Sequence, residues 1–334
     1  MEIREALKLV SEGGHLSFEQ AQEIFLAIFK GGANPDQVGA LLMGLKLNGE
    51  SPEEIAGLVK VLRTKAVKFK APKGTIDICG TGGDGLNTLN ISTAAAFVVA
   101  ACGVPVAKHG NRAVSSACGS ADVLEALGVR IEVLPSVMEA CLAETNFAFL
   151  FAPQYHPVLK EIGPIRRNLG FRTIFNLAGP LASPAQVRRQ LIGVSDKALL
   201  GPFAKISEYI GLEQAMIVHA EDGMDEISIS APTHVATLNM KSPKKIKPTT
   251  IYPLKAIKGG DAKYNATAIR KLFLDEGSEA FAAAVVANAA AGLMVAGKYD
   301  DMKTAYAAAT EILKSRSAYA LLNNIIEITN EYTG

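Results

Sequence analysis

The sequence has almost no net charge. It contains 34 lysines and arginines against 33 aspartates and glutamates, which leaves a formal net charge of +1 at pH 7. Proteins that bind nucleic acid without sequence preference, or that bind membrane surfaces, carry an excess of positive charge. The balance argues against both classes of partner, so an anion-binding function has to come from a local site.

Cysteine is also scarce. The four cysteines, Cys79, Cys102, Cys118 and Cys141, lie too far apart to form a CxxC metal or redox motif. Each has mainly apolar or small neighbours in the sequence. We therefore expect reduced, packed thiols in a cytoplasmic protein.

Long apolar runs are missing as well. Residues 94–107 are interrupted by Gly103 and Pro105, and residues 280–297 are mostly alanine and include Asn288. A membrane-spanning helix needs about 20 strongly apolar residues. The N-terminus lacks the basic start and apolar block of a signal peptide. The sequence predicts a soluble protein with no membrane partner.

What the chain does contain is material for two domains, because it has 334 residues of which 49% are hydrophobic. Residues 1–64 show only helical periodicity. Capping-box patterns begin at Ser17 and Ser51, and Asn34 stands before a proline suited to a first helical turn. This pattern predicts about four short helices, followed by a basic linker at 65–74.

From residue 75 short apolar runs alternate with helical segments, which is typical of a parallel sheet with covering helices. The predicted strands are TIDIC (75–79), VPVA (104–107), VRIEV (129–133), FAFLF (147–151), QLIGV (190–194) and AMIVH (215–219). The predicted fold class is α/β, with a small N-terminal helical domain at 1–70. A larger α/β domain with a mainly parallel central sheet follows at 71–334.

A glycine-rich loop, CGTGGDG, follows the first predicted strand and satisfies G-x-G-x-x-G with Gly80, Gly82 and Gly85. A dinucleotide fold is disfavoured because the next strand runs into basic residues, whereas a ribose diol needs an acid there. A Walker motif is excluded because no GK[ST] follows. The loop offers backbone N–H groups to an anion, but by itself it is equally compatible with a tight turn.

A second loop, KHGNRAVSSACGS at 108–120, changes this balance. It holds Lys108, Arg112, His109 and three serines before the next helix. Two donor-rich loops at the carboxyl ends of adjacent parallel strands converge on one crevice. A ligand with two separate phosphate groups explains both loops.

Four segments in order, GTGGDGLNTLNIST, KHGNRAVSSACGSADVLEALGV, IGPIRRNLGFRTIFNLAGPL and VHAEDGMDE, carry a resemblance over essentially the whole chain. The sequence resembles the anthranilate phosphoribosyltransferases. Departures are modest: GPLASP stands where the family more often has GPLTNP, and Ala220 replaces a usual glycine.

The resemblance implies transfer of the phosphoribosyl group of 5-phosphoribosyl 1-diphosphate to the amine of anthranilate in tryptophan biosynthesis. It also implies Mg²⁺ as cofactor, a cytoplasmic homodimer, and a helical domain completed by residues near 157–185. By resemblance, phosphoribosyl diphosphate contacts Gly80, Gly83, Asp84, Thr88, Asn90, Ile91, Ser92, Thr93, Lys108, His109, Gly110, Asn111, Arg112, Ala113, Val114, Ser115, Ser116 and Ser120. Anthranilate contacts Gly80, Asn111 and Arg166, and magnesium is held by Ser92, Asp225 and Glu226.

The residues alone leave alternatives for several of these roles. Asp225 and Glu226 also suit an acidic surface turn, and Arg166 is not distinguished from a solvated Arg167 except by the family pattern P-x-R-x-x-L-G. His156 is expected to shape the acceptor pocket and not to act as a base. Two other functions stay open on the same fold, a pyrimidine nucleoside phosphorylase and a nucleic-acid-binding relative.

Overall fold

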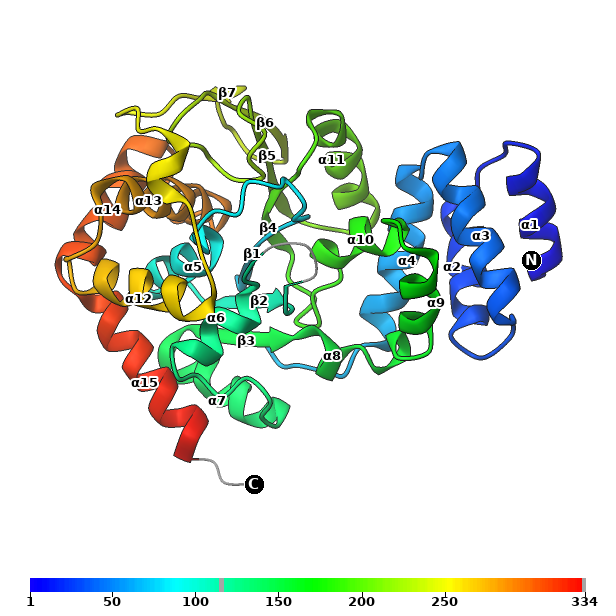
Figure 1. Cartoon of the computed structure of the whole chain (residues 1–334), viewed down its shortest axis with the longest axis horizontal. Coiled ribbons are helices and arrows are strands. Elements are labelled where there is room, and N and C mark those ends of the chain that lie inside the picture. Colours follow the sequence, from blue (N-terminus) through cyan, green and yellow to red (C-terminus); the bar gives the residue numbers. More distant parts are fainter. Residues whose placement is uncertain (114–116, 332–334) are drawn as a thin grey trace.

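The computed structural model describes residues 1–113 and 117–331, and its elements are labelled in Figure 1. The strands are β1 (Ile76–Gly80), β2 (Val106–Gly110), β3 (Phe147–Phe151), β4 (Arg189–Gly193), β5 (Gln214–Ala220), β6 (Thr233–Leu238) and β7 (Lys245–Ile246). The helices of the first half are α1 (Ile3–Ser11), α2 (Phe18–Ile28), α3 (Pro35–Asn48), α4 (Pro52–Lys65), α5 (Ile91–Ala101), α6 (Ser120–Ala126), α7 (Pro135–Thr145) and α8 (Ala152–Tyr155). Those of the second half are α9 (Ile162–Leu169), α10 (Ile174–Ala178), α11 (Leu200–Tyr209), α12 (Ala262–Phe273), α13 (Glu279–Val295), α14 (Met302–Lys314) and α15 (Ser317–Glu331).

The strands form one sheet in the order β3-β2-β1-β4-β5-β6-β7. The pairings from β3 to β5 are parallel, and β6 and β7 are added antiparallel at one edge. The strand order changes direction between β1 and β4, because β2 and β3 follow on one side and β5 on the other. Ligands bind at such a point in open α/β sheets. The predicted fold class, a helical domain plus an α/β domain with a mainly parallel sheet, is confirmed.

Successive side chains of a strand point to opposite faces of the sheet, so each face packs against its own layer of helices. Ile78, Leu191 and Met216 face the core formed with α5 and α13, whereas Cys79 and Ile192 face the core formed with α4 and α11. This second core is continuous with the interior of the small helical unit. The two faces of one sheet thus join the N-terminal helices to the larger domain.

One predicted strand is wrong. Residues 129–133 do not form a strand, although Val129, Ile131 and Val133 alternate inward and are buried. The backbone hydrogen bonds of this segment go to helices instead: the Val129 N–H donates to the Leu124 carbonyl at the end of α6, and the Arg130 N–H donates to Thr329 Oγ1 on α15. The alternation of apolar residues therefore indicates which side chains are buried, and not that the segment pairs with a strand.

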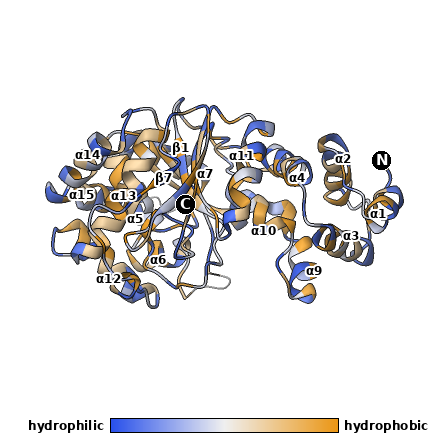
Figure 2. Cartoon of the chain, turned by 90° about the horizontal axis from the view of Figure 1, so that it is seen from above, coloured by the Kyte–Doolittle hydropathy of each residue, from blue (hydrophilic) through white to orange (hydrophobic). Residues whose placement is uncertain are grey.

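The small helical unit lies at the N-terminal end of the molecule (Figure 1). The capping boxes at Ser17, Asn34 and Ser51 are all present, so α2, α3 and α4 begin where the sequence predicts. From later in the chain, Ile162 on α9 and Phe175 on α10 join its core. Figure 2 shows the hydrophobic faces of these helices turned toward one another.

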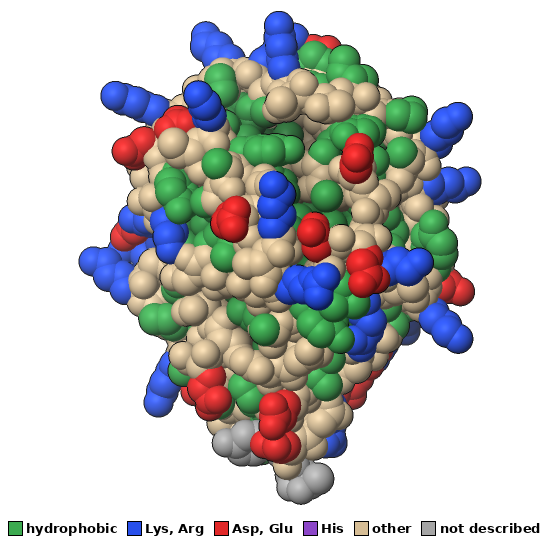
Figure 3. All heavy atoms as spheres, turned by 90° about the vertical axis from the view of Figure 1, so that its left-hand side faces the viewer, with side chains coloured by type: hydrophobic (Ala, Val, Ile, Leu, Met, Phe, Trp, Pro, Cys, Tyr) green, Lys and Arg blue, Asp and Glu red, His purple; other side chains and the backbone are tan. Residues whose placement is uncertain are grey.

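The opposite face of the molecule is covered by C-terminal helices. In Figure 3, basic and acidic side chains are interspersed over this face, with no large field of one sign. Such a surface lacks the basic stripe of a nucleic-acid binder. Within residues 1–113 and 117–331, no helix has both the length and the apolar character needed to cross a membrane.

Candidate functional site

A cleft of about 560 Å³ opens at the carboxyl ends of β1 and β2, where the two donor-rich loops meet. Of the residues singled out in the sequence, its wall contains Gly80, Gly83, Asp84, Thr88, Asn90, Ser92, Thr93, Lys108, His109, Gly110, Asn111, Arg112, Ala113, Ser120, Asp225 and Glu226. Val114, Ser115 and Ser116 fall outside the described residues. Ile91 is fully buried in the core, and neither Ile91 nor Arg166 is part of the cleft wall.

The turn that follows β5 reaches this cleft by close packing against two glycines. Gly80 and Gly193 are register partners at the ends of β1 and β4. A Cβ at Gly80 would lie 2.7 Å from Asp225 Oδ2, and one at Gly193 would lie 1.5 Å from the Asp225 carbonyl oxygen. Only glycine at both positions lets Asp225 enter the site.

The glycine loop itself is pinned by the same carboxylate. Gly82 and Gly83 have φ angles of 59° and 82°, which glycine adopts without strain. The Gly82 N–H donates to Asp225 Oδ2 at 2.8 Å. The expectation that this N–H is turned outward to an anion therefore needs correction, because it already has an anionic partner within the protein.

The two carboxyl groups of the turn, Asp225 and Glu226, both have raised pKa values. Burial, reinforced by Asp84, raises the pKa of Asp225 to about 6, and burial with the neighbouring Asp225 raises the pKa of Glu226 well above its usual value. Glu226 Oε1 accepts from the Ser92 N–H at 3.1 Å, whereas the buried Oε2 has no hydrogen-bond partner. An acidic surface turn is thus the wrong description. An unpartnered buried oxygen in a group of hard-oxygen donors fits a divalent cation.

Lys108 is a fixed cation beneath these acids. It is 2% exposed, and its Nζ donates to the Ile78 carbonyl at 2.6 Å and to Ser92 Oγ at 3.2 Å. Behind it lies Asp77, whose pKa burial raises to about 7. Lys108 is therefore not a solvated surface charge, and its position is set by strand contacts before any ligand binds.

The second loop is organised by an acid on α6. Asp122 Oδ2 accepts from the N–H groups of Ala113 and Gly119, both at 2.8 Å. Arg112 pairs with Glu125 and with Glu132, the latter at 3.2 Å. Arg112 lines the cleft, but its charge is shared with these acids on its outer side.

Arg166 and Arg167 lie in different environments, as the sequence alone did not show. Arg167 is exposed, whereas Arg166 is partly buried, with its guanidinium 5.3 Å over the Phe175 ring. Arg166 Nη2 donates to Asn176 Oδ1 at 3.3 Å, and Asn176 lines the cleft. Arg166 is one side chain removed from the cleft, and burial lowers its pKa.

Two histidines lie together at the inner end of this region. The rings of His109 and His156 are in edge-to-face contact, with centroids 5.1 Å apart. Burial lowers the pKa of His156 to about 4 and that of His109 well below its usual value. Both are neutral at pH 7. His109 lines the cleft, whereas His156 is not part of its wall.

Comparison with known proteins agrees with this architecture. Residues 4–66 match the model of the glycosyl transferase family helical bundle domain, and residues 72–319 match that of the family's a/b domain. Anthranilate phosphoribosyltransferase of Xanthobacter autotrophicus is 44% identical over 339 residues, covering 99% of this chain and 97% of that protein. The enzyme of Rhodopseudomonas palustris strain BisA53 is 43% identical over 336 residues, covering 99% of each chain.

The chain belongs to the anthranilate phosphoribosyltransferase family.

Solved structures of the family agree. The Thermus thermophilus anthranilate phosphoribosyltransferase superposes with a TM-score of 0.92 at 39% identity, covering 97% of this chain and 99% of that one. The Saccharomyces cerevisiae enzyme in complex with PRPP and Mg gives a TM-score of 0.87 at 25% identity, covering 98% of each chain. The resemblance seen in the sequence is confirmed, and the comparisons support neither the phosphorylase nor the nucleic-acid-binding alternative.

Within this family fold, one arginine in the cleft wall was missed by the sequence analysis. Arg172 follows α9 and donates from Nη2 to the Thr81 carbonyl and from Nη1 to the Gly82 carbonyl, both at 3.1 Å. Among the described residues no carboxylate lies within ion-pairing distance of Arg172. A Cβ at Gly83 would lie 1.6 Å from its Nη1. The only sign of it in the sequence is a third arginine, in NLGFRT, shortly after Arg166 and Arg167.

A second missed residue ties α12 to both loops. Asn265 is 1% exposed, and its Nδ2 donates to Asn90 Oδ1 at 2.8 Å. Asn90 in turn donates from Nδ2 to the Cys118 carbonyl at 3.2 Å. This chain of amides explains why Asn90 holds position at the start of α5 without capping the helix through its own side chain.

We predict that Arg172→Ala weakens binding of inorganic diphosphate to the magnesium-loaded protein by about tenfold or more, because a charge-assisted donor and the clamp on the glycine loop are both lost. Stability should change little, since the side chain is exposed. Titration calorimetry measures the affinity, and Arg167→Ala is the matched control. Equal affinities in the wild type and Arg172→Ala would show that the clamp does not contribute to anion binding.

Proposed function

We propose that this chain transfers the phosphoribosyl group of 5-phosphoribosyl 1-diphosphate to the amine of anthranilate, and that the cleft described above is where it does so. The observation that carries the assignment of the site is the meeting of two donor-rich loops with a buried carboxylate pair in one cleft. The family membership supports the reaction. Loss of anthranilate fluorescence with phosphoribosyl diphosphate, magnesium and pure protein tests it directly.

The reaction places particular demands on these residues. The bond from the ribose anomeric carbon to diphosphate breaks, a bond from that carbon to the anthranilate nitrogen forms, and the nitrogen loses a proton. The aryl amine is neutral at pH 7, so its lone pair is free without a strong base. The barrier lies in the departure of diphosphate from a cation-like centre, so the site has to neutralise leaving-group charge and fix geometry.

For this task the chain supplies fixed donors at the mouth and base of the cleft. We propose that Lys108, Arg172 and the hydroxyls of Ser92 and Thr93 hold phosphate oxygens. Lys108 needs no reorganisation because strand and helix contacts already place its ammonium group. A donor that is in place before the reaction stabilises charge at no further cost.

The carboxylate pair fits magnesium. We propose that Asp225 and Glu226, with Ser92, hold the ion, which when bound stabilises negative charge on the diphosphate. Within residues 1–113 and 117–331, no group of three His, Cys, Asp or Glu side chains is arranged to hold a metal unaided. This matches an ion that takes its remaining oxygens from substrate phosphates and water, as Mg²⁺ commonly does.

On the acceptor side, we propose that Arg166 recognises the carboxylate of anthranilate and that Gly80 and Asn111 contact the same substrate. A guanidinium forks onto a carboxylate with two hydrogen bonds. Arg166 is held over Phe175 and bonded to Asn176, so it can turn from Asn176 to the substrate. The neutral pair His109–His156 offers the aromatic ring an uncharged wall.

Replacing Arg166 separates the two substrates. Arg166→Ala should raise the KM for anthranilate by roughly 10- to 100-fold, the effect of losing a charge-assisted pair, and leave the KM for phosphoribosyl diphosphate nearly unchanged. The exposed neighbour provides the control, because Arg167→Ala should change neither constant. If both variants behave alike in steady-state kinetics, the assignment of Arg166 is wrong.

Replacing the carboxylate pair tests the metal. Asp225→Asn with Glu226→Gln keeps size and most hydrogen bonding but removes two charges. Turnover should fall about 100-fold or more, as when a major electrostatic stabiliser is lost, and saturation should require more magnesium. The measurement is turnover against magnesium concentration. An unchanged magnesium curve with full turnover would contradict the assignment.

The same variant should be the more stable protein when metal is absent. A carboxyl group whose pKa is raised in the folded state favours folding only while protonated, so the wild type loses stability as pH rises from about 4 through about 6 for Asp225. Thermal melting of metal-free proteins should show the variant ahead above pH 6 and the two converging toward pH 4. A destabilised variant would instead point to a structural role.

We propose further that residues 1–70, completed by residues near 157–185, act as a helical domain beside an α/β domain at 71–334. The shared core of α4 with α9 and α10 supports this division. The four cysteines are free, and Cys79, Cys118 and Cys141 are buried. This supports a cytoplasmic location, since exported domains of such composition gain stability from disulfides.

The helical domain also carries the best candidate for a homodimer surface. On α3, Leu47 is 78% exposed and Met43 is 40% exposed. Large apolar side chains close together on a surface helix mark an interaction site. We propose that two copies of the chain associate through this helix.

Introducing charge on this surface tests the dimer. Met43→Glu with Leu47→Glu should produce monomers in analytical ultracentrifugation, because burying two carboxylates in an apolar interface is unfavourable. Leu134→Glu is the control, since Leu134 is 64% exposed but lies on the other domain. A dimer that survives the α3 changes would place the interface elsewhere.

A further inference from the structure

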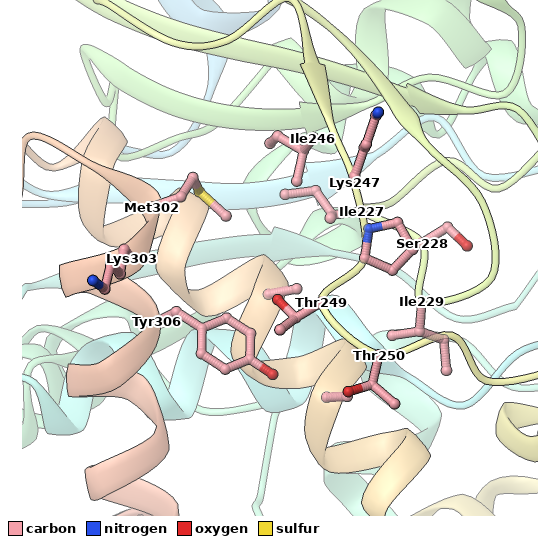
Figure 4. Close-up of a pocket in the computed structure, with 13 residues that line it drawn as sticks. Ile227, Ser228, Ile229, Ile246, Lys247, Thr249, Thr250, Met302, Lys303 and Tyr306 are labelled. Carbon is pink, nitrogen blue, oxygen red and sulfur yellow. The ribbon is translucent and has the colours of Figure 1, made fainter.

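A second cavity of about 330 Å³ lies behind the carboxylate turn and shares no lining residue with the cleft. It is enclosed by the segment that follows Glu226, by the loop after β7, and by α13 and α14 (Figure 4). Its size is within the range of about 300–1,000 Å³ found for small-molecule sites. Nothing in the proposed reaction uses it.

The interior of the cavity is apolar. Ile227, Ile229 and Ile246 are buried side chains that form part of the wall, and Met302 adds a flexible one. Ala283 and Ala287 on α13 leave room that larger residues would fill. An occupant therefore gains by burying a compact apolar body such as a one- or two-ring aromatic group.

Polar side chains line only parts of the cavity wall. Lys247 and Lys303 line the rim, and neither forms an ion pair with any described residue. Figure 4 shows the Tyr306 ring inside the cavity with its hydroxyl on the side of Thr249 and Thr250. Among the described residues that line the cavity, none is Asp or Glu. The charge complementarity favours an occupant with one anionic group beside its apolar body.

The cavity wall is connected to the carboxylate pair. On α13, Asn288 grips the backbone of Ile227, accepting from its N–H and donating to its carbonyl, both at 3.0 Å. Asn288 is adjacent to Ala287 of the cavity, and Ile227 is adjacent to Glu226 of the cleft. Asn288 is 2% exposed, so this clamp is a rigid link between the two sites.

We propose that this cavity binds a small aromatic monocarboxylate and that its occupancy changes the affinity of the cleft for magnesium. The apolar body fills the space between Ile229 and α13, and the carboxylate meets Lys247 or Lys303, which lie on different sides of the cavity (Figure 4). An occupant that shifts Ile227 moves Glu226, because the two residues are adjacent in the chain and Asn288 holds the backbone of Ile227. Binding stands on the cavity alone, whereas the coupling rests on the metal role proposed for Glu226.

The binding test uses 1-naphthoate as the probe and 1-naphthamide as its uncharged counterpart. Titration calorimetry on the full chain without magnesium should show saturable binding of the acid and at least about threefold weaker binding of the amide, the scale of exposed ion pairs. Lys247→Gln with Lys303→Gln should weaken the acid by about 3- to 10-fold and leave the amide unchanged. Absence of saturable binding, or equal binding of acid and amide, would overturn the proposal.

A matched control uses the residue just before β7 and the same helix, α14. Lys244→Gln with Lys314→Gln removes two exposed lysines that do not line the cavity, so it should leave 1-naphthoate affinity at the wild-type value. An equal loss in both double variants would mean that 1-naphthoate responds to overall charge and not to this cavity. All four positions are on the surface, and thermal melting verifies that each variant is folded.

The coupling test measures magnesium affinity by calorimetry with and without saturating 1-naphthoate. The dissociation constant for magnesium should change at least about threefold in the wild type, within the usual range of coupling energies, and stay constant in Lys247→Gln with Lys303→Gln. The same change in both proteins would place the probe in the cleft and refute the coupling. If magnesium fails to bind at all, the proposed function fails at Glu226 while the naphthoate titration still decides the cavity.

Discussion

The packing of the Asp225 turn against Gly80 and Gly193 is the constraint on which the site depends. The two glycines are register partners on β1 and β4. They leave a gap at the carboxyl ends of these strands, where a backbone can approach without meeting a side chain. The turn after β5 fills that gap and carries two carboxyl groups into the cleft. Without it, the glycine loop would lose its contact with Asp225, and the two loops would face each other without a carboxylate pair between them.

Burial of acids is costly, and the structure shows what offsets part of that cost. Lys108 is held near Glu226 by a strand carbonyl and by Ser92, and the Ser92 N–H donates to the same carboxylate. These contacts do not satisfy every oxygen, because Glu226 Oε2 is left without a partner. The cost of burying the carboxylate pair is therefore only partly offset within the protein itself.

Residues from α9, α10 and the segment between them also support the cleft. Arg172, from the segment between α9 and α10, holds the carbonyl side of the glycine loop, while Asp225 holds its N–H side. Arg166, on α9, approaches the cleft through Asn176 on α10. One short stretch of chain, 162–178, therefore contacts the glycine loop and places Arg166 and Asn176 beside the cleft.

The sequence by itself determined the elements and the chemistry, because caps, periodicity and loop composition are local properties. The capping boxes at Ser17 and Ser51 predict where two helices start, and the two donor-rich loops predict an anion site. It failed where the answer depended on partners distant in the chain. The alternation at 129–133 predicted a strand, but the backbone of this segment bonds to α6 and α15 instead of to a strand. Arg166 and Arg167 could not be distinguished until Phe175 and Asn176 were seen beside Arg166. Only the tertiary structure decided that Arg172 reaches the glycine loop and that Asp225 and Glu226 are held inside the cleft, since those positions follow from backbone packing that no local pattern records.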